Sequence, residues 1–337
     1  VKNFNTYLAP TNCKQVIYVG GIANEQSLSK HLWSRKNVEN ILYQGSAAVT
    51  VLRAAIIVGS GSASFEIIRD LCEKLPLMVT PRWVKTKCQP IAIRDVLNYL
   101  TGVLGNKECY NESFDIGGPD VLSYREMMEG YGRFRKLNLT IVTLPFLSPK
   151  ISSYWLYFVT STSYKLALNL VDSMRIEVIT SDTRLKDILK IESISYQKAI
   201  ELAFKKIKQN QVVSSWKDSM ISGRFRNDLK KYIEVPVNGC VKDKQSIVLK
   251  NPEKALENIW SIGGKRGWYY ANWLWRLRGG VDKLFGGVGL RRGRTNTNTI
   301  NEGDALDFWR VILADKTQKR LLLFAEMRVP GEAWLEF

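Results

Sequence analysis

The chain has 337 residues, and its 49 lysines and arginines exceed its 32 aspartates and glutamates by 17. With 45% hydrophobic and 24% charged residues, the composition is that of a globular protein and excludes a disordered or fibrous chain. Single cores rarely grow beyond about 250 residues, so the length predicts two domains. No uncharged apolar run reaches the roughly 18 residues of a transmembrane helix, and the first residues lack the pattern of a secretory signal.

The cysteines and the histidine limit the chemistry that we expect. Five cysteines are scattered along the chain without a C-x-x-C spacing, so we expect neither a zinc site nor a disulfide framework, and no metal. Free thiols favour a reducing, cytoplasmic compartment. His31 is the single histidine, which excludes mechanisms that need two imidazoles.

The first two thirds of the chain alternate predicted strands and helices. Residues 16–19 are a continuous apolar run that predicts a buried parallel strand, closed by Gly20 and Gly21. Apolar residues at helical spacing predict a helix over 27–43. A second buried strand is expected over 49–58, followed by a loop of small residues. This alternation is typical of a parallel α/β sheet.

The same alternation continues beyond residue 60. Apolar spacing predicts a helix over 65–75, and residues 91–93 predict a short strand. Asp95 is expected to cap the N-terminus of a helix over 96–104. The serine and glutamate of 123–126 have the spacing of a capping box before another helix.

The end of the first part predicts a boundary between two domains. Residues 139–175 are rich in aromatic side chains, which would either cover a substrate or pack in the core; we favour packing. A last amphipathic helix is expected over 200–207, and the mixed polar stretch 205–222 is the best linker candidate. We therefore predict domains over residues 1–212 and 213–337.

The last third is aromatic and basic. Helical segments followed by predicted strands over 305–312 and 319–327 indicate an α+β domain. Single-stranded nucleic acid, an anionic membrane surface and simple packing could each explain aromatic residues among basic ones. No known nucleic-acid-binding signature is present, so nucleic acid is unlikely as a partner, and packing is favoured over membrane contact.

Several motifs together resemble the extended and atypical branches of the short-chain dehydrogenase/reductase superfamily. Residues 16–21 resemble the strand that ends at the catalytic serine, and 51–59 resemble the strand whose end contacts the nicotinamide. Residues 89–96 and 114–119 resemble later strands of the same fold. The similarity covers about residues 10–215 and is closest to predicted nucleoside-diphosphate-sugar epimerases.

Those proteins carry a C-terminal domain of unknown function that resembles a START/polyketide-cyclase helix-grip fold. Residues 263–276 and 286–293 resemble this second domain. The fold class implied is thus a Rossmann-like α/β sheet followed by an α+β helix-grip-like domain. Val1 is not a methionine and residues 332–337 read as an interrupted strand, so we expect both ends to be cut.

The resemblance also implies site residues and a cofactor, NAD(P). The family's Tyr-x-x-x-Lys motif aligns with His31 and Arg35, and Gly21 stands where the serine would be. Histidine can exchange protons near neutral pH, whereas arginine cannot act as a base. The usual chemistry is therefore either lost or carried by His31. The implied cofactor contacts are Gly20, Gly21, Arg35, Arg53, Ala54, Ala55 and Ile56, and the implied substrate contacts are Arg82, Trp83, Gln89 and Arg94.

The dinucleotide fingerprint G-x-x-G-x-x-G is absent from this sequence, so we expect cofactor binding by the chain alone to be weak or absent. Two functions follow from the resemblance. The first is an oxidoreductase acting on a small apolar or lipid-like molecule; the second is a non-catalytic nucleotide sensor or assembly factor at a membrane.

START-like folds enclose a cavity, so the resemblance of the last third implies a ligand pocket beside a charged surface. We expect Trp268, Tyr269, Trp273 and Trp275 to line or abut this apolar pocket. Unpaired charges are costly to bury, so the neighbouring arginines should face solvent, where they would attract anionic lipid headgroups peripherally. These arginines are Arg276, Arg278, Arg291, Arg292 and Arg294.

Overall fold

The computed structural model describes residues 1–22, 30–144, 153–154, 156–157, 160, 164–209, 232–236, 238–264, 266–285, 287, 289, 294, 299–327 and 331–337. The chain divides into a first unit, residues 1–159 with 165–205, and a second unit, residues 160–164 with 206–337. The predicted boundary between 212 and 213 lies outside the described residues and stays a prediction.

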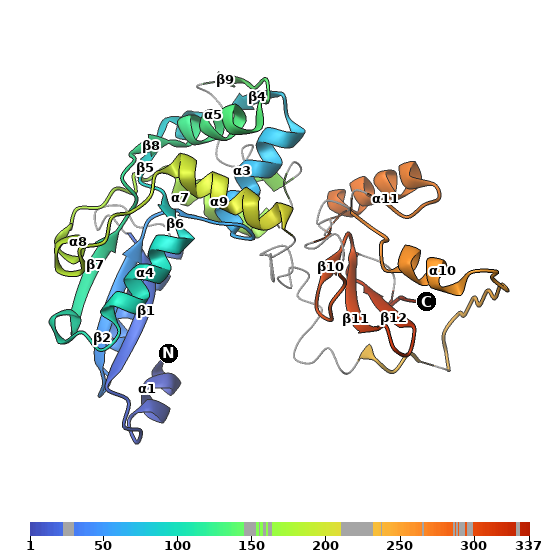
Figure 1. The fold of residues 1–337 in the computed structure, drawn as a ribbon, viewed down its shortest axis with the longest axis horizontal. Coiled ribbons are helices and arrows are strands. Elements are labelled where there is room, and N and C mark those ends of the chain that lie inside the picture. The colour runs from blue at the N-terminus through green and yellow to red at the C-terminus, as the bar shows by residue number, and fades with distance from the viewer. Residues whose placement is uncertain are drawn as a thin grey trace. The chain divides into compact units, whose positions relative to one another are not determined.

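A parallel sheet forms the centre of the first unit (Figure 1). Strands β1 (Gln15–Gly21), β2 (Ala48–Ala54) and β7 (Glu112–Ile116) pair in the order β1-β2-β7, with every pairing parallel. This confirms the predicted α/β fold class with a Rossmann-like sheet. The strand predicted at 16–19 is present, but β1 is mostly half-buried because it has a single partner among the described strands.

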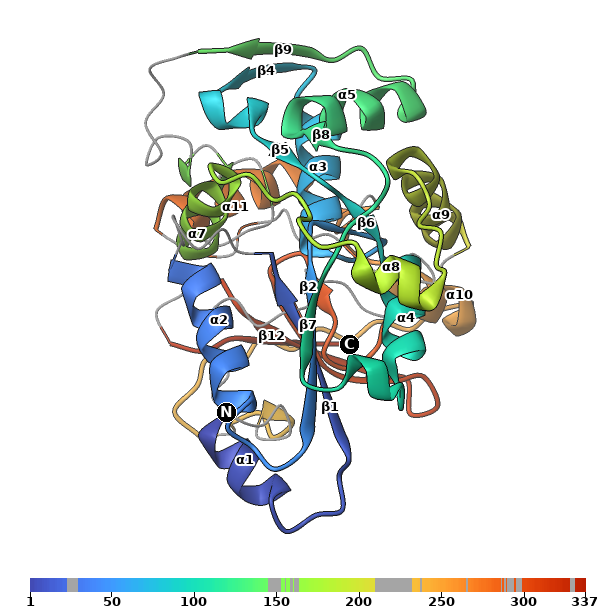
Figure 2. The same cartoon turned by 90° about the vertical axis from the view of Figure 1, so that its left-hand side faces the viewer.

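Helices cover both faces of this sheet, as Figure 2 shows for α2 and α4. Helix α2 (Lys30–Leu42) packs on the face that carries Val51, whereas α4 (Ile93–Val103) and α8 (Arg184–Leu189) pack on the face that carries Leu52. Successive residues of a strand point to opposite faces, and both of these side chains are fully buried. Two covered faces explain why the strand reads as a continuous apolar run.

The single strand predicted over 49–58 is wrong. β2 ends at Ala54, and Ile57–Val58 forms a separate strand, β3, that pairs in parallel with β6 (Ile91–Ala92). The Ala55 amide donates to the Ile116 carbonyl at the end of β7, after which the chain leaves the sheet. An apolar run cannot by itself distinguish one buried strand from two.

The helix termini agree with the sequence in two places and differ in one. Helix α3 (Ala63–Lys74) begins after an N-cap serine, and α5 (Tyr124–Arg135) begins with the predicted capping box. Helix α4 instead begins before Asp95, so Asp95 is not its N-cap. The buried Asp95 carboxylate accepts a hydrogen bond from the Ile194 amide at 2.9 Å, a contact between distant segments that local spacing does not reveal.

The remaining elements of the first unit are short, apart from α7 and α9. No helix in the described part of the chain has the length and apolar content needed to cross a membrane. In the aromatic stretch 139–175, Tyr157 is buried and Tyr154 is exposed. The elements are α1 (Lys2–Leu8), β4 (Leu77–Thr80), η1 (Arg82–Lys85), β5 (Lys87–Cys88), η2 (Lys107–Cys109), β8 (Leu122–Ser123), β9 (Thr140–Thr143), α7 (Tyr164–Met174) and α9 (Tyr196–Lys208).

In its described residues, the second unit contains an antiparallel sheet and two α-helices, as the α+β prediction requires. The predicted strand over 305–312 is a tight hairpin instead, because Asp307 adopts a left-handed conformation with φ of 54° between β10 and β11. The elements are α10 (Pro252–Ile259), α11 (Asn272–Leu284), β10 (Ala305–Leu306), β11 (Trp309–Asp315), β12 (Arg320–Ala325) and β13 (Trp334–Glu336).

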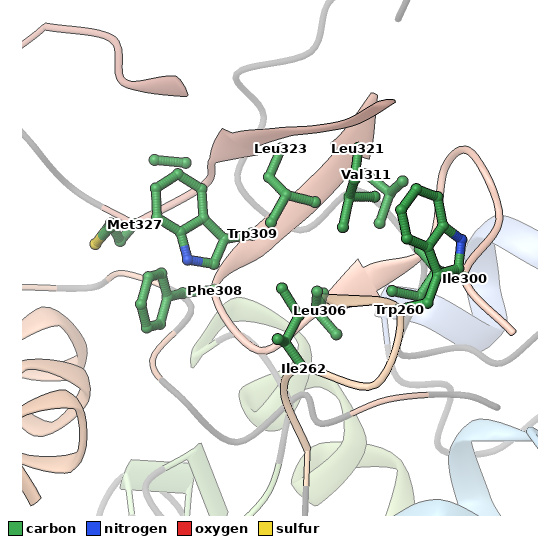
Figure 3. Packing of buried hydrophobic residues seen from close by; sticks show 11 residues of the cluster. Trp260, Ile262, Ile300, Leu306, Phe308, Trp309, Val311, Leu321, Leu323 and Met327 are labelled. Carbon is green, nitrogen blue, oxygen red and sulfur yellow. The ribbon is translucent and has the colours of Figure 1, made fainter. Parts of the chain in front are cut away.

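One face of this sheet carries the larger apolar core described in the unit. Figure 3 shows Phe308, Trp309, Val311 and Leu323 among the clustered side chains, with Trp260 joining them from the end of α10. Burial of such large side chains stabilises the fold by about 1.5–3 kcal/mol each. The core therefore holds α10 against the sheet.

The opposite face carries a buried ion pair. Arg310 and Glu326 are both fully buried, and Arg310 donates from Nε and Nη2 to Oε1 of Glu326 at 3.1 and 2.9 Å. Its Nη1 also donates to the Gly303 carbonyl at 2.6 Å. Ile312 and Phe324 pack on the same face in a second apolar cluster. The pair thus joins β11 to the strand end beyond β12.

Replacement of Arg310 should test this pair. We expect Arg310→Met to lower the free energy of unfolding by about 3–5 kcal/mol, since it leaves the Glu326 carboxylate buried without its charge partner. Adding Glu326→Leu should recover most of that loss. Urea denaturation monitored by circular dichroism would measure both, with Arg320→Met, which breaks the exposed bridge to Glu336, as the control. A double variant no more stable than Arg310→Met would contradict the argument.

Candidate functional site

The carboxyl ends of the parallel strands bring most of the predicted cofactor residues to one edge of the sheet. Gly20 lies opposite Arg53 and Gly21 opposite Ala54 in the register of β1 and β2. Ala54 and Ala55 are buried, whereas Gly21 and Ile56 are half-buried. Small residues at this edge leave room for a ligand to approach the backbone, as dinucleotide-binding sheets require.

Helix α2 returns to the same edge. Parallel strands need a crossover connection, so α2 runs back between β1 and β2 with its first turn at their carboxyl ends. Positions 31, 35 and 39 are four residues apart and share one side of the helix. His31 is in the first turn, but its side chain lies outside the described residues. Arg35 is exposed, and its backbone carbonyl accepts a hydrogen bond from the Tyr18 hydroxyl at 3.5 Å.

An ion pair holds this side of α2 against the sheet. Arg53 donates from Nε and Nη2 to the two carboxylate oxygens of Glu39 at 3.3 and 2.6 Å, and Lys36 donates to Glu39 at 3.0 Å. Burial raises the pKa of Glu39, but the hydrogen bonds from Arg53 and Lys36 outweigh that effect and leave the pKa below its ordinary value. Arg53, an expected cofactor contact, thus has its guanidinium on α2.

Glu39 therefore acts as a positioning residue that the sequence analysis assigned no role. Glu39 is 4% exposed and, with Leu42, is one of the buried residues among those of this helix whose side chains are described. The signal in the sequence was its spacing of four residues from Arg35, which puts both on the side of the helix that faces the sheet edge. Its partner on β2 could not be known before the strands were paired.

The loop after β7 is braced by Gln89, an expected substrate contact. Its Nε2 donates to the Gly118 carbonyl at 2.7 Å, and its Oε1 accepts from the amide and hydroxyl of Thr180 at 3.0 and 2.8 Å. A Cβ on Gly118 would lie 2.1 Å from the Pro90 carbonyl oxygen, so this position needs glycine. Gln89 thus ties three segments together.

The other expected substrate residues lie on different elements. Arg82 and Trp83 are on η1, and Arg94 is an exposed residue at the start of α4. Trp83 is buried and packs edge-to-face on Tyr124, with ring centroids 5.9 Å apart. Among the described residues, the Trp83 indole Nε1 has no hydrogen-bond partner. A buried donor of this kind is a candidate for an interaction with a bound molecule or water.

The aromatic group expected to line a pocket in the second unit is divided by the structure, which contradicts that prediction. Trp268 and Trp275 pack against Phe308 in the core, with ring centroids 6.1 and 5.4 Å from it. Tyr269 and Trp273 are instead exposed. Large rings at successive positions of a turn and a helix cannot all face the same way.

The expectation that the basic residues face solvent is confirmed for two of the described arginines and is wrong for a third. Arg276 and Arg278 are exposed. Arg294 is half-buried and donates to the carbonyls of Trp260, Ile262 and Thr299 at 3.0–3.1 Å. Burial lowers its pKa, and the carbonyls satisfy the guanidinium that solvent was expected to satisfy. Arg291 and Arg292 lie outside the described residues.

A comparison with protein families finds one match, in the second unit. A family described as "Protein of unknown function (DUF2867)" matches residues 240–337. This agrees with the expected C-terminal domain of unknown function; the description gives no fold, so the START-like fold stays a prediction. No curated protein matches the chain.

Solved structures of nucleotide-sugar enzymes have a similar fold. The UDP-glucuronic acid 4-epimerase of Bacillus cereus is 12% identical, with a TM-score of 0.46 over 62% of this chain and 66% of that one. A nucleoside-diphosphate-sugar epimerase from Staphylococcus aureus is 11% identical, with a TM-score of 0.48 over 59% and 69%. The enzyme WbmG of Bordetella bronchiseptica is 11% identical, with a TM-score of 0.46 over 62% and 63%. The alignments thus span about two thirds of these proteins.

The pH dependence of stability should reveal the ion pair on α2. Because the folded pKa of Glu39 is lowered, its contribution is complete above the unfolded value of about 4.3 and is lost as the pH falls through the folded value. We expect Glu39→Gln to lower the free energy of unfolding by about 1–3 kcal/mol at neutral pH and by progressively less in acid.

Urea denaturation from pH 7 down to about pH 3 would measure this difference. Glu192→Gln, which removes an exposed carboxylate of the same unit, is the matched control and should leave the neutral-pH stability unchanged. Parallel pH profiles for the wild type and Glu39→Gln would show that the pair does not hold α2.

Proposed function

We propose that this protein binds NAD(P) as an epimerase-like oxidoreductase of the short-chain dehydrogenase/reductase type, with His31 and Arg35 at the positions of the catalytic tyrosine and lysine. The observation that carries the proposal is the convergence of α2 with the Gly20-Gly21 end of β1. The solved structures have TM-scores below 0.5, so the proposal depends on the residues of α2 and of the β1 end.

The geometry of α2 places positions 39, 35 and 31 in this order toward the carboxyl ends of the strands. With Glu39 held by Arg53, Arg35 is one turn, about 6 Å, nearer the carboxyl edge, and position 31 is a further turn on. The half-buried Gly21 and the small residues that end β2 fit the approach of a dinucleotide at this edge. Arg35, which is exposed and always charged, would donate hydrogen bonds to a ribose or phosphate oxygen.

Proton transfer in this proposal belongs to His31. An imidazole exchanges a proton near neutral pH, so it can take the role that a tyrosine has in the resembling family. A bound nicotinamide would supply hydride transfer to or from the substrate carbon.

The substrate class in this proposal is an apolar or lipid-like molecule with at least one hydrogen-bond acceptor. The indole donor of the buried Trp83, which has no partner among the described residues, supports the presence of an acceptor on the substrate. Two of the solved relatives contain UDP-glucuronic acid with NAD, or UDP with NAD. Nucleotide-linked sugars and lipids are the substrates to test first.

A non-catalytic nucleotide sensor or assembly factor is the second candidate. It is favoured by the commitment of two expected ligand contacts to internal bonds, since Arg53 bonds Glu39 and Gln89 bonds Gly118 and Thr180. Gly21 also has no hydroxyl to donate to a substrate. This candidate keeps nucleotide binding and lacks turnover.

Nucleotide binding should depend on Arg35. In the protein expressed from its complete gene, we expect Arg35→Ala to weaken NADPH binding about tenfold or more, the loss of a charged hydrogen bond. Fluorescence titration with NADPH would measure it. Arg175→Ala, which removes an exposed arginine of the same unit, is the control and should leave the affinity unchanged. Equal affinities for the two variants, or no binding by the wild type, would refute the proposed cofactor site.

Turnover should depend on His31. With a substrate found by screening nucleotide-linked sugars and lipids, His31→Ala should cut kcat by about 10²-fold or more while NADPH still binds. Asn37→Ala, an exposed change on the same helix, should leave kcat unchanged. Binding without any turnover would favour the non-catalytic candidate, whereas an unchanged rate in His31→Ala would refute the role of His31 in proton transfer.

A further inference from the structure

Helix α11 of the second unit has an exposed face made of large apolar side chains. Trp273 is 67% exposed and Leu284 is 70% exposed, values usual for lysine or glutamate on a surface helix. At 100° per residue, the side chains within the helix occupy one continuous sector about 100° wide, and Tyr270 and Phe285 flank the helix in the chain. This apolar stripe consists of Tyr270, Trp273, Leu274, Leu277, Val281, Leu284 and Phe285.

The other side of α11 is already used for packing. Trp275 contacts the core cluster of the sheet, and Gly279 is buried next to it in the helical pattern. Lys283 is also buried and donates from Nζ to the Thr160 carbonyl at 2.7 Å. The helix therefore has two apolar sides, one in the core and one facing outward, so the stripe is not the face that folds the unit.

The charges around the stripe all have one sign. Asp282 is the one acidic residue of the helix; it is buried and accepts a hydrogen bond from the Gly289 amide at 2.8 Å. Arg276 and Arg278 are exposed, and the helical wheel puts them beyond opposite borders of the stripe. The exposed surface of α11 is thus apolar in the middle and cationic at both sides.

We propose that α11 lies along the surface of an anionic lipid bilayer, with the apolar stripe at the boundary between headgroups and acyl chains. An apolar sector with cations at its borders is the arrangement of helices that lie in this interface. Trp273 and Tyr270 suit its depth because their rings are apolar and their tips polar. The exposed Arg276 would extend to the headgroup phosphates, whereas Arg278, which donates from Nε to Met327 Sδ at 3.2 Å, would keep its charge at the other border of the stripe.

Charge complementarity favours an anionic lipid surface over a protein groove as the partner of the apolar stripe. A protein partner would be expected to meet the stripe with an apolar groove and mixed charges at the rim. Here the rim of α11 exposes cations and no acid, and the whole chain has an excess of 17 basic residues. Anionic headgroups match both features. The inference is independent of NAD(P) binding.

Vesicle flotation with the complete chain tests the proposal. We expect binding to vesicles of phosphatidylglycerol and phosphatidylcholine in equal amounts at low salt, and much weaker binding to phosphatidylcholine alone. Leu284→Gln should reduce partitioning about tenfold, since it removes a leucine from the apolar phase at unchanged charge. Leu104→Gln is the matched control: Leu104 is also 70% exposed but lies in the first unit, so partitioning should not change.

A second measurement reports the depth of α11. Quenching of tryptophan fluorescence by brominated lipids should be strong in the wild type, and Trp273→Phe should remove most of it while binding persists. Arg276→Gln should weaken binding several-fold at low salt and reduce its salt dependence. Circular dichroism would confirm that each variant is folded; these side chains are exposed, so none should unfold the unit.

Three results would overturn the proposal. One is the absence of binding to anionic vesicles at low salt. Another is equal partitioning of Leu284→Gln and Leu104→Gln, which would mean that charge alone draws the protein to the vesicle and the stripe is not inserted. The third is self-association that Leu284→Gln abolishes in sedimentation velocity without any vesicle binding, which would assign the stripe to a second copy of the chain.

Discussion

Parallel pairing of β1 and β2 is the constraint on which the first unit depends. Parallel neighbours cannot be joined by a tight turn, so the chain must cross back over the sheet, and it does so as α2. This places the first turn of α2 beside the carboxyl ends of the strands. The Arg53–Glu39 ion pair then fixes which side of the helix faces the sheet. Leu42 and Val38 of the helix, which pack in the cluster of Val49 and Val51, set its rotation together with this pair.

The second unit has the opposite arrangement, because its helices are held by large aromatic residues. Trp260, Trp268 and Trp275 join α10 and α11 to one face of the antiparallel sheet. The same rings leave the far side of α11 outside the core, where its apolar residues face outward. On the other face of the sheet, the buried ion pair of Arg310 and Glu326 links β11 to the end of β12, and its formation requires the desolvation of both charges.

Polar residues near the carboxyl ends of the parallel strands hold loops in place, a role that differs from direct contact with a ligand. Gln89 is an implied substrate contact in a segment that resembles a later strand of the family's fold, yet its amide holds the Gly118 loop and Thr180 in place. Asp115 similarly accepts from the amide and hydroxyl of Ser181 at 3.1 and 2.9 Å. In the proposed site, such bonds would position the loops without contacting a ligand, so substitution there would disturb binding indirectly.

Local sequence determined the fold class, most helices and the ends of several elements, because apolar periodicity and capping act over a few residues. The capping box at Ser123, the strand before Gly20 and the helix after Ser62 are of this kind. Tertiary structure alone decided the break between β2 and β3, the role of Asp95 and the pairing of Glu39 with Arg53. Each depends on a partner from a distant segment: the end of β7, the amide of Ile194, or a neighbouring strand. Tertiary packing also determined which side of α11 is buried: Trp275 packs against the core, whereas Trp273 is exposed. The sequence could not distinguish them, because both positions are tryptophan.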